Sequence, residues 1–178
     1  GEIESTCFGY GKLNKVKIYD SINFPHSLGE TYTAVTKFLG FKPESGEGTV
    51  MALAALGNKN KKIRRLNITY NELFKKIIII KNNKFEIDLD WFVFWKKRSP
   101  IRVSKKFIKV FGQPRKRYQK LNENHKNIAA ALQSRFEEAY MACIKGLLKK
   151  TKQKNLVLSG GCALNCKANG LLEKNFNL

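Results

Sequence analysis

The stretch most informative about the fold class is residues 158–170, which read LSGGCALNCKANG and follow NLV at 155–157. An apolar run that ends at two glycines and continues into a helix-compatible segment is typical of a strand, a tight turn and a helix. We therefore expect a buried strand over NLVLSGG (155–161), a glycine loop, and a helix over ALNCKANGLLEK (163–174). This order of elements indicates an α/β architecture.

The glycine loop has two interpretations. Glycines between a strand end and a helix start leave backbone N–H groups free and admit a ligand close to the main chain, as nucleotide sites require. Asn165, early in the helix, would then hydrogen-bond a ribose hydroxyl or a phosphate. The loop is neither GxGxxG nor a Walker P-loop, so the pattern alone leaves a tight packing turn as the other interpretation.

A long amphipathic helix is expected before this loop, over residues 124–150. Apolar residues recur there every three or four positions and lysines gather at the C-terminal end, as the helix dipole favours. The positions expected to be buried are Ile128, Leu132, Phe136, Ala139, Cys143 and Leu147. His125, at the helix start, is expected to have a structural role.

Residues 2–23 predict a β-hairpin. Two β-prone runs flank the turn-like GKLN, and the alternation in KVKIY directs its lysines outward and Val16 and Ile18 inward.

Two helices are expected after the hairpin. Residues 26–41 have apolar side chains at helical spacing, with Ser27 as N-cap and Gly40 as C-cap, so this helix should present one face to a sheet. KPESGEG then leads into a short helical segment, TVMALAAL, whose start lies beside Glu47 and two glycines. A helix N-terminus beside flexible glycines can approach a ligand closely.

The expected elements divide the chain into three parts. Residues 1–57 are the first part of the α/β domain, residues 58–120 are a basic inserted subdomain, and residues 121–178 contribute a helix, a strand, a loop and a helix. The insert should contain a strand pair, KIIIIKNNKFEIDLD, with an Asn-Asn turn. The aromatic run WFVFW (91–95) is expected in the core; as a strand it would instead place Trp91, Val93 and Trp95 on one face, as a base-stacking platform requires.

The formal charge of +20 comes from 34 Lys and Arg residues against 14 Asp and Glu residues. These cations are scattered among Asn and Ile, which favours a solvated, compositionally biased surface. The local clusters KKRSPIRVSKK and PRKRYQK, expected on loops and helix ends, leave open a patch for an anionic nucleotide or partner, or nucleic-acid binding.

The four cysteines show neither paired CxxC motifs nor the density of a disulfide scaffold, and no apolar run is long enough to span a bilayer. We expect a soluble, cytoplasmic protein without a membrane partner. Because the chain begins without methionine and stops near a helix end, we also expect it to be a fragment.

Two stretches carry a family resemblance. GGCALNCKANG (160–170) is similar to the GGxALNxxxNG loop of carbamoyltransferases of the NodU/TobZ type, and residues 24–54 resemble their FPHSLG…GExKVMGLA segment. Between them, KFEIDLDWFVF, FGQPR and NHKNIAAALQSRFEE also resemble family stretches, in the same order.

The resemblance implies an incomplete domain of the actin/sugar-kinase/Hsc70 (ribonuclease H-like) type, related to TsaD, with a YrdC-like domain on the same full-length chain. In the family, ATP and carbamoyl phosphate give carbamoyladenylate, and the carbamoyl group passes to a hydroxyl of a small-molecule acceptor, in natural-product or glycan biosynthesis. Iron or another divalent metal is expected, with its ligands outside this chain.

By resemblance, the nucleotide-binding residues are those at the matching motif positions. They are Gly160, Gly161 and Asn165 in the glycine loop, Gly46 and Glu47 in SGEG, and His26, Ser27 and Gly29 in PHSLG. No catalytic residue is identified. Cys162 and Cys166, four apart without a second pair, are expected to be small buried residues rather than metal ligands.

The sequence also departs from the family pattern. Thr49 replaces the usual lysine before Val-Met, and Ala52 replaces a glycine, which puts ligand affinity and substrate choice in doubt. The HxxxH metal motif and a later aspartate are absent, as expected of a piece lying between them, so this piece alone should be inactive. The alternatives are a TsaD-like tRNA-modifying protein and a basic nucleic-acid-binding module.

Overall fold

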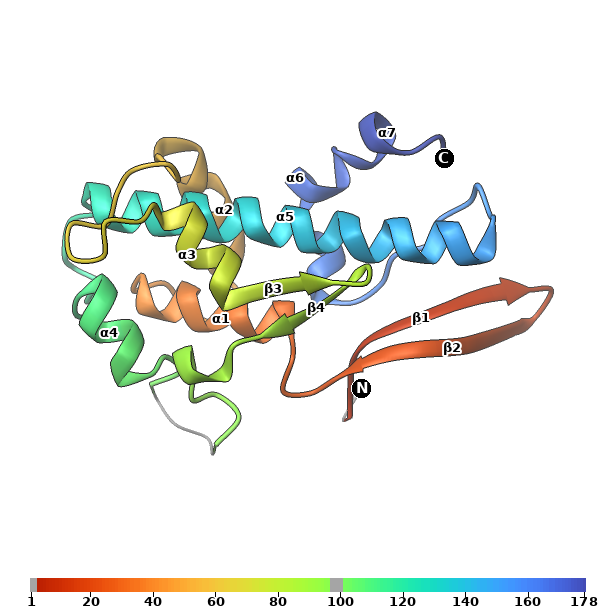
Figure 1. Cartoon of the computed structure of the whole chain (residues 1–178), viewed down its shortest axis with the longest axis horizontal. Helices are drawn as coiled ribbons and strands as arrows, with labels where there is room; N and C mark the ends of the chain where they lie inside the picture. Colours follow the sequence, from red (N-terminus) through yellow and green to blue (C-terminus); the bar gives the residue numbers. More distant parts are fainter. Residues whose placement is uncertain (1–2, 97–100) are drawn as a thin grey trace.

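The computed structural model describes residues 3–96 and 101–178. One long helix, α5 (Glu123–Thr151), runs through the molecule, and the other elements lie around it (Figure 1). The hairpin of β1 (Glu4–Lys12) and β2 (Lys15–Asn23) extends beside its C-terminal half, and a second hairpin, β3 (Ile78–Lys81) and β4 (Lys84–Ile87), packs against its middle.

The remaining elements are short. They are α1 (Leu28–Phe38), α2 (Glu47–Leu53), η1 (Ala54–Leu56), α3 (Tyr70–Ile77), η2 (Leu89–Trp91), α4 (Lys105–Phe111), η3 (Gly161–Leu164), α6 (Cys166–Asn169) and α7 (Leu172–Asn175). Both sheets in the described part of the chain are two-stranded and antiparallel. The α/β class is therefore confirmed, while the ribonuclease H-like fold stays a prediction.

The predicted long helix is confirmed as α5. Five of the six positions expected to be buried are buried, and Leu147 is half-buried against the core. The helix begins in a capping box, in which the Asn122 side chain accepts from the backbone N–H of His125 (3.1 Å) and Nδ1 of His125 accepts from the N–H of Asn122 (3.2 Å). Burial, and then the nearby Arg115, lower the pKa of His125. The structural role expected for this histidine is confirmed.

Helix α1 has the predicted N-cap, since Ser27 accepts a hydrogen bond from the N–H of Glu30. The C-cap is Leu39 and not the predicted Gly40, which follows it with φ +77°. The expectation that α1 faces a sheet is wrong, since its principal contacts are with helices α2, η3 and α5.

The N-terminal hairpin is confirmed, but its inward face was assigned wrongly. Val16 and Ile18 are 78% and 52% exposed, whereas Phe8 and Ile22, nearer the open end of the hairpin, are buried. The tip extends away from the other elements (Figure 1), so no core covers its apolar side chains. A register irregularity between Phe8 and Gly9 also breaks the alternation along β1.

The predicted strand at 155–161 and the single helix at 163–174 are both wrong. Val157 is 91% exposed, and residues 155–159 are not paired with any strand that the structure describes. A strand requires a hydrogen-bonded neighbour, so the apolar run stays without regular structure. The helix divides because the Asn165 side chain caps α6 and starts a new turn there.

The middle of the chain contains the predicted β3–β4 hairpin, with Asn82 and Asn83 at φ 52° and 60° in its turn. Trp91 and Phe92 are buried, and Trp91 packs against Phe107 and Phe111, so the core interpretation of WFVFW is confirmed for these two residues, whereas Trp95 is exposed. The run is not a strand. Part of the cluster KKRSPIRVSKK, residues 97–100, lies outside the described residues.

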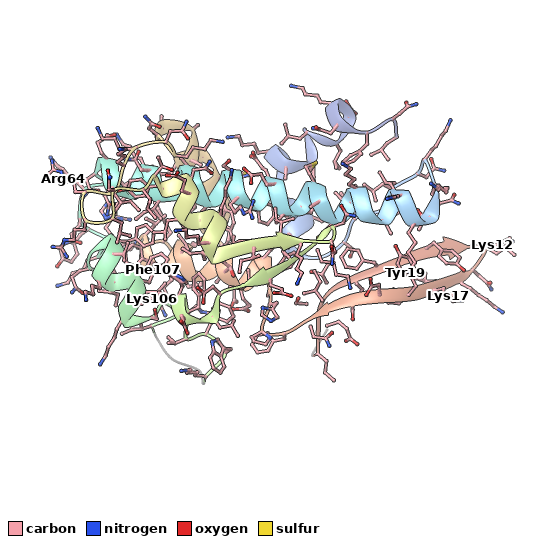
Figure 2. All side chains as sticks on the ribbon, in the orientation of Figure 1. Lys12, Lys17, Tyr19, Arg64, Lys106 and Phe107 are labelled. Atoms are coloured by element: carbon pink, nitrogen blue, oxygen red, sulfur yellow. The ribbon has the colours of Figure 1, made fainter. Side chains whose placement is uncertain are left out.

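Cationic side chains are distributed over both ends of the molecule. Figure 2 shows Lys12 and Lys17 on the hairpin and Arg64 and Lys106 at the opposite end. Among the described helices, none combines the length and the hydropathy needed to cross a membrane.

Arg115, in the FGQPR segment, joins two loops through backbone carbonyls. It is 8% exposed, and Nε donates to the carbonyl of Leu39 (2.6 Å) at the end of α1. The guanidinium also donates to the carbonyls of Gly40, Lys116, Arg117 and Gln119. A single planar cation thus donates to carbonyl groups of both loops.

We predict that Arg115→Met lowers the free energy of unfolding by about 2 to 4 kcal/mol, because several carbonyls lose a charged donor. Arg115→Lys should recover only part of this loss, since an ammonium group cannot reproduce the planar fork. Urea denaturation followed by tryptophan fluorescence measures the effect. Arg117→Met, at an exposed neighbour, is the control, and equal losses in both variants would contradict the prediction.

Candidate functional site

A cavity of about 430 Å³ opens between α1, α2, α5 and the glycine loop. Its lining comes from residues far apart in sequence, namely Gly29, Tyr32, Thr33, Glu44, Ser45, Glu47, Gly48, Met51, Phe136, Gly161, Cys162, Leu164 and Asn165. Segments 29–51 and 161–165, the two that carry the motif residues, form most of this wall.

Four of the eight predicted site residues line the cavity: Gly29, Glu47, Gly161 and Asn165. The other four, described next, lie beside its walls in structural positions.

His26 and Ser27 anchor the start of α1. Nδ1 of His26 accepts from the N–H of Ile87 (3.0 Å) in β4, and its carbonyl accepts from the Ser5 hydroxyl. Ser27 is the N-cap already described. Both residues hold the segment that presents Gly29 to the cavity.

The glycines of the two motifs differ in what surrounds them. A Cβ on Gly46 would lie 2.7 Å from the Lys42 carbonyl, and Gly160 has φ +92°, so packing and backbone conformation respectively require glycine there. By contrast, a Cβ on Gly161 or Gly48 would meet no described atom within 4 Å, and neither has a positive φ. These two cavity-lining glycines leave bare backbone facing open space.

The Glu47 carboxylate is held in place by two hydrogen bonds to one of its oxygens. Oε1 accepts from the hydroxyl of Thr33 (2.9 Å) and from the N–H of Glu44 (3.0 Å). Oε2 has no hydrogen-bond partner among the described residues, which leaves an acceptor for a ligand at the cavity wall.

Asn165 is held by hydrogen bonds on both sides of its amide. Oδ1 accepts from the N–H of Ala168 (3.0 Å) and from Nε2 of Gln133 (3.0 Å), and Nδ2 donates to Oε1 of Gln133 (3.0 Å). The second hydrogen of Nδ2 has no partner in the described part of the chain. A ligand in the cavity would therefore meet Asn165 as a donor.

Tyr32 closes the inner end of the cavity. Its hydroxyl donates to Gln133 Oε1 (2.8 Å), and its ring packs edge-on against Phe136. Burial, with smaller contributions from Glu137 and Glu47, raises the pKa of Tyr32. The phenol is thus a neutral hydrogen-bond donor, and the inner wall is aromatic.

The cysteines divide into two environments. Burial raises the pKa of Cys162 to about 11 and that of Cys143 to about 12, so both are neutral thiols near pH 7. Cys166 was expected to be buried, but it is exposed, with Sγ 3.9 Å from the Met51 sulfur.

A metal site is not formed by the residues that the structure describes. Among residues 3–96 and 101–178, no three His, Cys, Asp or Glu side chains cluster closely enough to hold an ion. The side chains at the cavity therefore do not fit the divalent metal expected from the resemblance.

Several lining residues were missed at the sequence level. Tyr32 and Phe136 belong to the apolar stripes of α1 and α5, where an aromatic residue predicts only core. Gly48 belongs to the SGEG motif, in which only Gly46 and Glu47 were predicted as site residues. No sequence pattern indicated Gln133, which bonds Asn165 without lining this cavity.

The comparisons with known proteins agree with the family resemblance of the sequence. The family described as "Carbamoyltransferase N-terminus" matches residues 1–177. The chain is 31% identical over 97% of its length to the uncharacterized protein sll1178 of Synechocystis, covering 27% of that protein.

Two other relatives are similar over nearly the whole chain. The uncharacterized protein MJ1051 of Methanocaldococcus jannaschii is 27% identical over 93% of the chain and is covered to 29%. Nodulation protein NolNO of Sinorhizobium fredii is 26% identical over 97% of the chain and is covered to 22%. The chain thus spans about a quarter of the length of these relatives.

We predict that iodoacetamide at pH 7.5 labels Cys7 and Cys166 well before Cys143 and Cys162, because Cys143 is buried, Cys162 is half-buried, and both are neutral thiols. Mass spectrometry of the labelled peptides measures the order. Early labelling of Cys162 would contradict the placement of the loop.

The free energy of unfolding should also fall as the pH rises from about 8.5 to 11, since the thiols of Cys143 and Cys162 ionise first in the unfolded chain.

Proposed function

The chain belongs to the carbamoyltransferase N-terminus family, and from this premise we propose that it forms the adenylate-binding wall of an O-carbamoyltransferase. The ligand would be carbamoyladenylate, made from carbamoyl phosphate and ATP in a YrdC-like domain of the full-length chain. The acceptor would be a hydroxyl of a small molecule, in natural-product or glycan biosynthesis.

The observation that carries this proposal is the bare backbone at Gly161 and Gly48. Neither packing nor a positive φ requires glycine at these positions, and both face the cavity. Glycine within the first turn of α2 costs stability relative to alanine, on the order of 0.5 to 1 kcal/mol. A ligand that lies against the main chain would account for these two glycines, whereas the packing and backbone conformation of the fold do not.

The polar groups of the cavity suit a ribonucleotide. Oε2 of Glu47 would accept from a ribose hydroxyl, and the free N–H of Asn165 would donate to a ribose or phosphate oxygen. Met51, Phe136 and Leu164 supply apolar surface for a base. The volume, about 430 Å³, falls in the ordinary range for small-molecule sites.

In the proposed reaction, the acceptor oxygen attacks the carbamoyl carbon. A carbon–oxygen bond forms to the acceptor, the bond to the adenylate phosphate breaks, and AMP leaves with the bonding electrons. The described residues contribute binding and orientation of the adenylate. The proton of the acceptor hydroxyl is released to solvent in this scheme. The expected divalent metal is assigned to none of the described side chains, because no three His, Cys, Asp or Glu residues among them cluster closely enough to hold it.

We predict that Gly161→Val in the complete protein weakens binding of a non-hydrolysable carbamoyladenylate analogue by at least about tenfold, because the branched side chain enters the ligand space. Its melting temperature should stay within about 1 °C, since the Cβ meets no described atom within 4 Å. Calorimetric titration and a melting curve measure the two effects.

Gly11→Val, on the exposed hairpin away from the cavity, is the matched control and should leave affinity unchanged. The packing-turn interpretation predicts the reverse pattern for Gly161→Val, with lowered stability and intact affinity. That pattern would refute the nucleotide assignment.

A further inference from the structure

Gln133 occupies a position that neither a motif nor core packing explains. It is 1% exposed in the middle of α5, where Ala129, Ala130 and Phe136 lie one turn away and the half-buried Glu137 shares its face. A second cavity of about 290 Å³ is lined in part by Gln133, Glu137, Lys59 and Lys167. Gln133 thus lines this second cavity and is hydrogen-bonded to Asn165, which lines the first.

All four hydrogen-bonding positions of this amide are used. Oε1 accepts from the hydroxyl of Tyr32 (2.8 Å) and from Nδ2 of Asn165 (3.0 Å). Nε2 donates to Oδ1 of Asn165 (3.0 Å) and to Oε1 of Glu137 (2.9 Å). Gln133 and Asn165 are thus joined by a reciprocal pair of amide hydrogen bonds.

The direction of this pair is fixed at both ends by groups with only one polarity. At one end, the backbone N–H of Ala168 can only donate, so it requires the oxygen of Asn165. At the other end, the carboxylate of Glu137 can only accept, so it requires the nitrogen of Gln133. Rotation of either amide by 180° would set like groups against each other.

We infer that Gln133 is a positioning residue of the site: it locks the Asn165 amide so that the first cavity always meets an N–H donor, and thereby selects ligands that present an acceptor oxygen there. This role rests on the nucleotide site proposed above. Without Gln133, Asn165 would keep one anchor, Ala168, and its nitrogen would lose the partner that fixes its direction.

The distinguishing test is a double-variant cycle on ligand affinity in the complete protein. Gln133→Met keeps the side-chain length and removes the hydrogen bonds. We expect Gln133→Met and Asn165→Ala each to weaken binding of a non-hydrolysable carbamoyladenylate analogue by about 3- to 10-fold. The double variant should lose no more than the larger single loss, because Gln133 acts through Asn165.

Asn127→Ala is the matched control, since Asn127 is another buried amide of α5 and its Oδ1 accepts from the N–H of Asn58 (2.7 Å), away from the first cavity. It should lower the melting temperature and leave affinity unchanged. If Gln133→Met does not fold, Glu137→Ala, which removes the carboxylate anchor from a half-buried position, should weaken binding about 2- to 5-fold.

Three results would overturn the inference. Unchanged affinity in Gln133→Met, or in Glu137→Ala where that variant replaces it, would remove the positioning role. Multiplicative losses in the double variant would reduce Gln133 to a general structural residue. Failure of the unaltered protein to bind the analogue would overturn the nucleotide proposal itself and this inference with it, and that arm distinguishes the two failures.

Discussion

The burial of α5 is the constraint on which the rest of the structure depends. Ile128, Ala129, Ala131 and Leu132 are at most 1% exposed, and the small alanines let neighbouring elements approach the helix axis closely. Helices α1, α2 and α3 and the hairpin β3–β4 all pack on this helix. At the cavity, α1 and the glycine loop meet α5 at Gln133 through Tyr32 and Asn165, and α2 also packs on α5.

The surroundings of each glycine show whether backbone packing or the candidate site accounts for it. At Gly57 a Cβ would lie 2.0 Å from the Lys126 carbonyl, and at Gly40 it would lie 2.5 Å from the Arg115 carbonyl, so close backbone packing explains both. At Gly48 and Gly161 there is only open space. Two packing glycines and two open ones in one small chain show that glycine content alone does not identify a ligand site; the surroundings of each glycine do.

Local signals in the sequence predicted where helices and turns form better than they predicted which segments pack against them. The periodicity of α5, the Ser27 cap and the Asn-Asn turn of β3–β4 depend on residues close in sequence, and these predictions are confirmed. The exposure of Val16 and Val157 depends on whether another segment covers them, which periodicity cannot report. In the same way, the motifs indicated Glu47, Gly161 and Asn165 separately, but only the packing of α5 brings them to one cavity and adds Tyr32 and Phe136.

The polar character of position 133 has a cost that stability alone does not explain. Replacing a fully satisfied buried polar network with apolar side chains of similar volume is often neutral or stabilising, whereas removing one partner leaves the others unsatisfied at about 1 to 3 kcal/mol each. A leucine at 133 with apolar partners would hold α1 and α5 together equally well. It would leave the N–H of Ala168 as the one of these groups that fixes the direction of the Asn165 amide, because a leucine cannot transmit the polarity set by Glu137. The buried amide is therefore better explained by what it presents to the cavity than by the packing it provides.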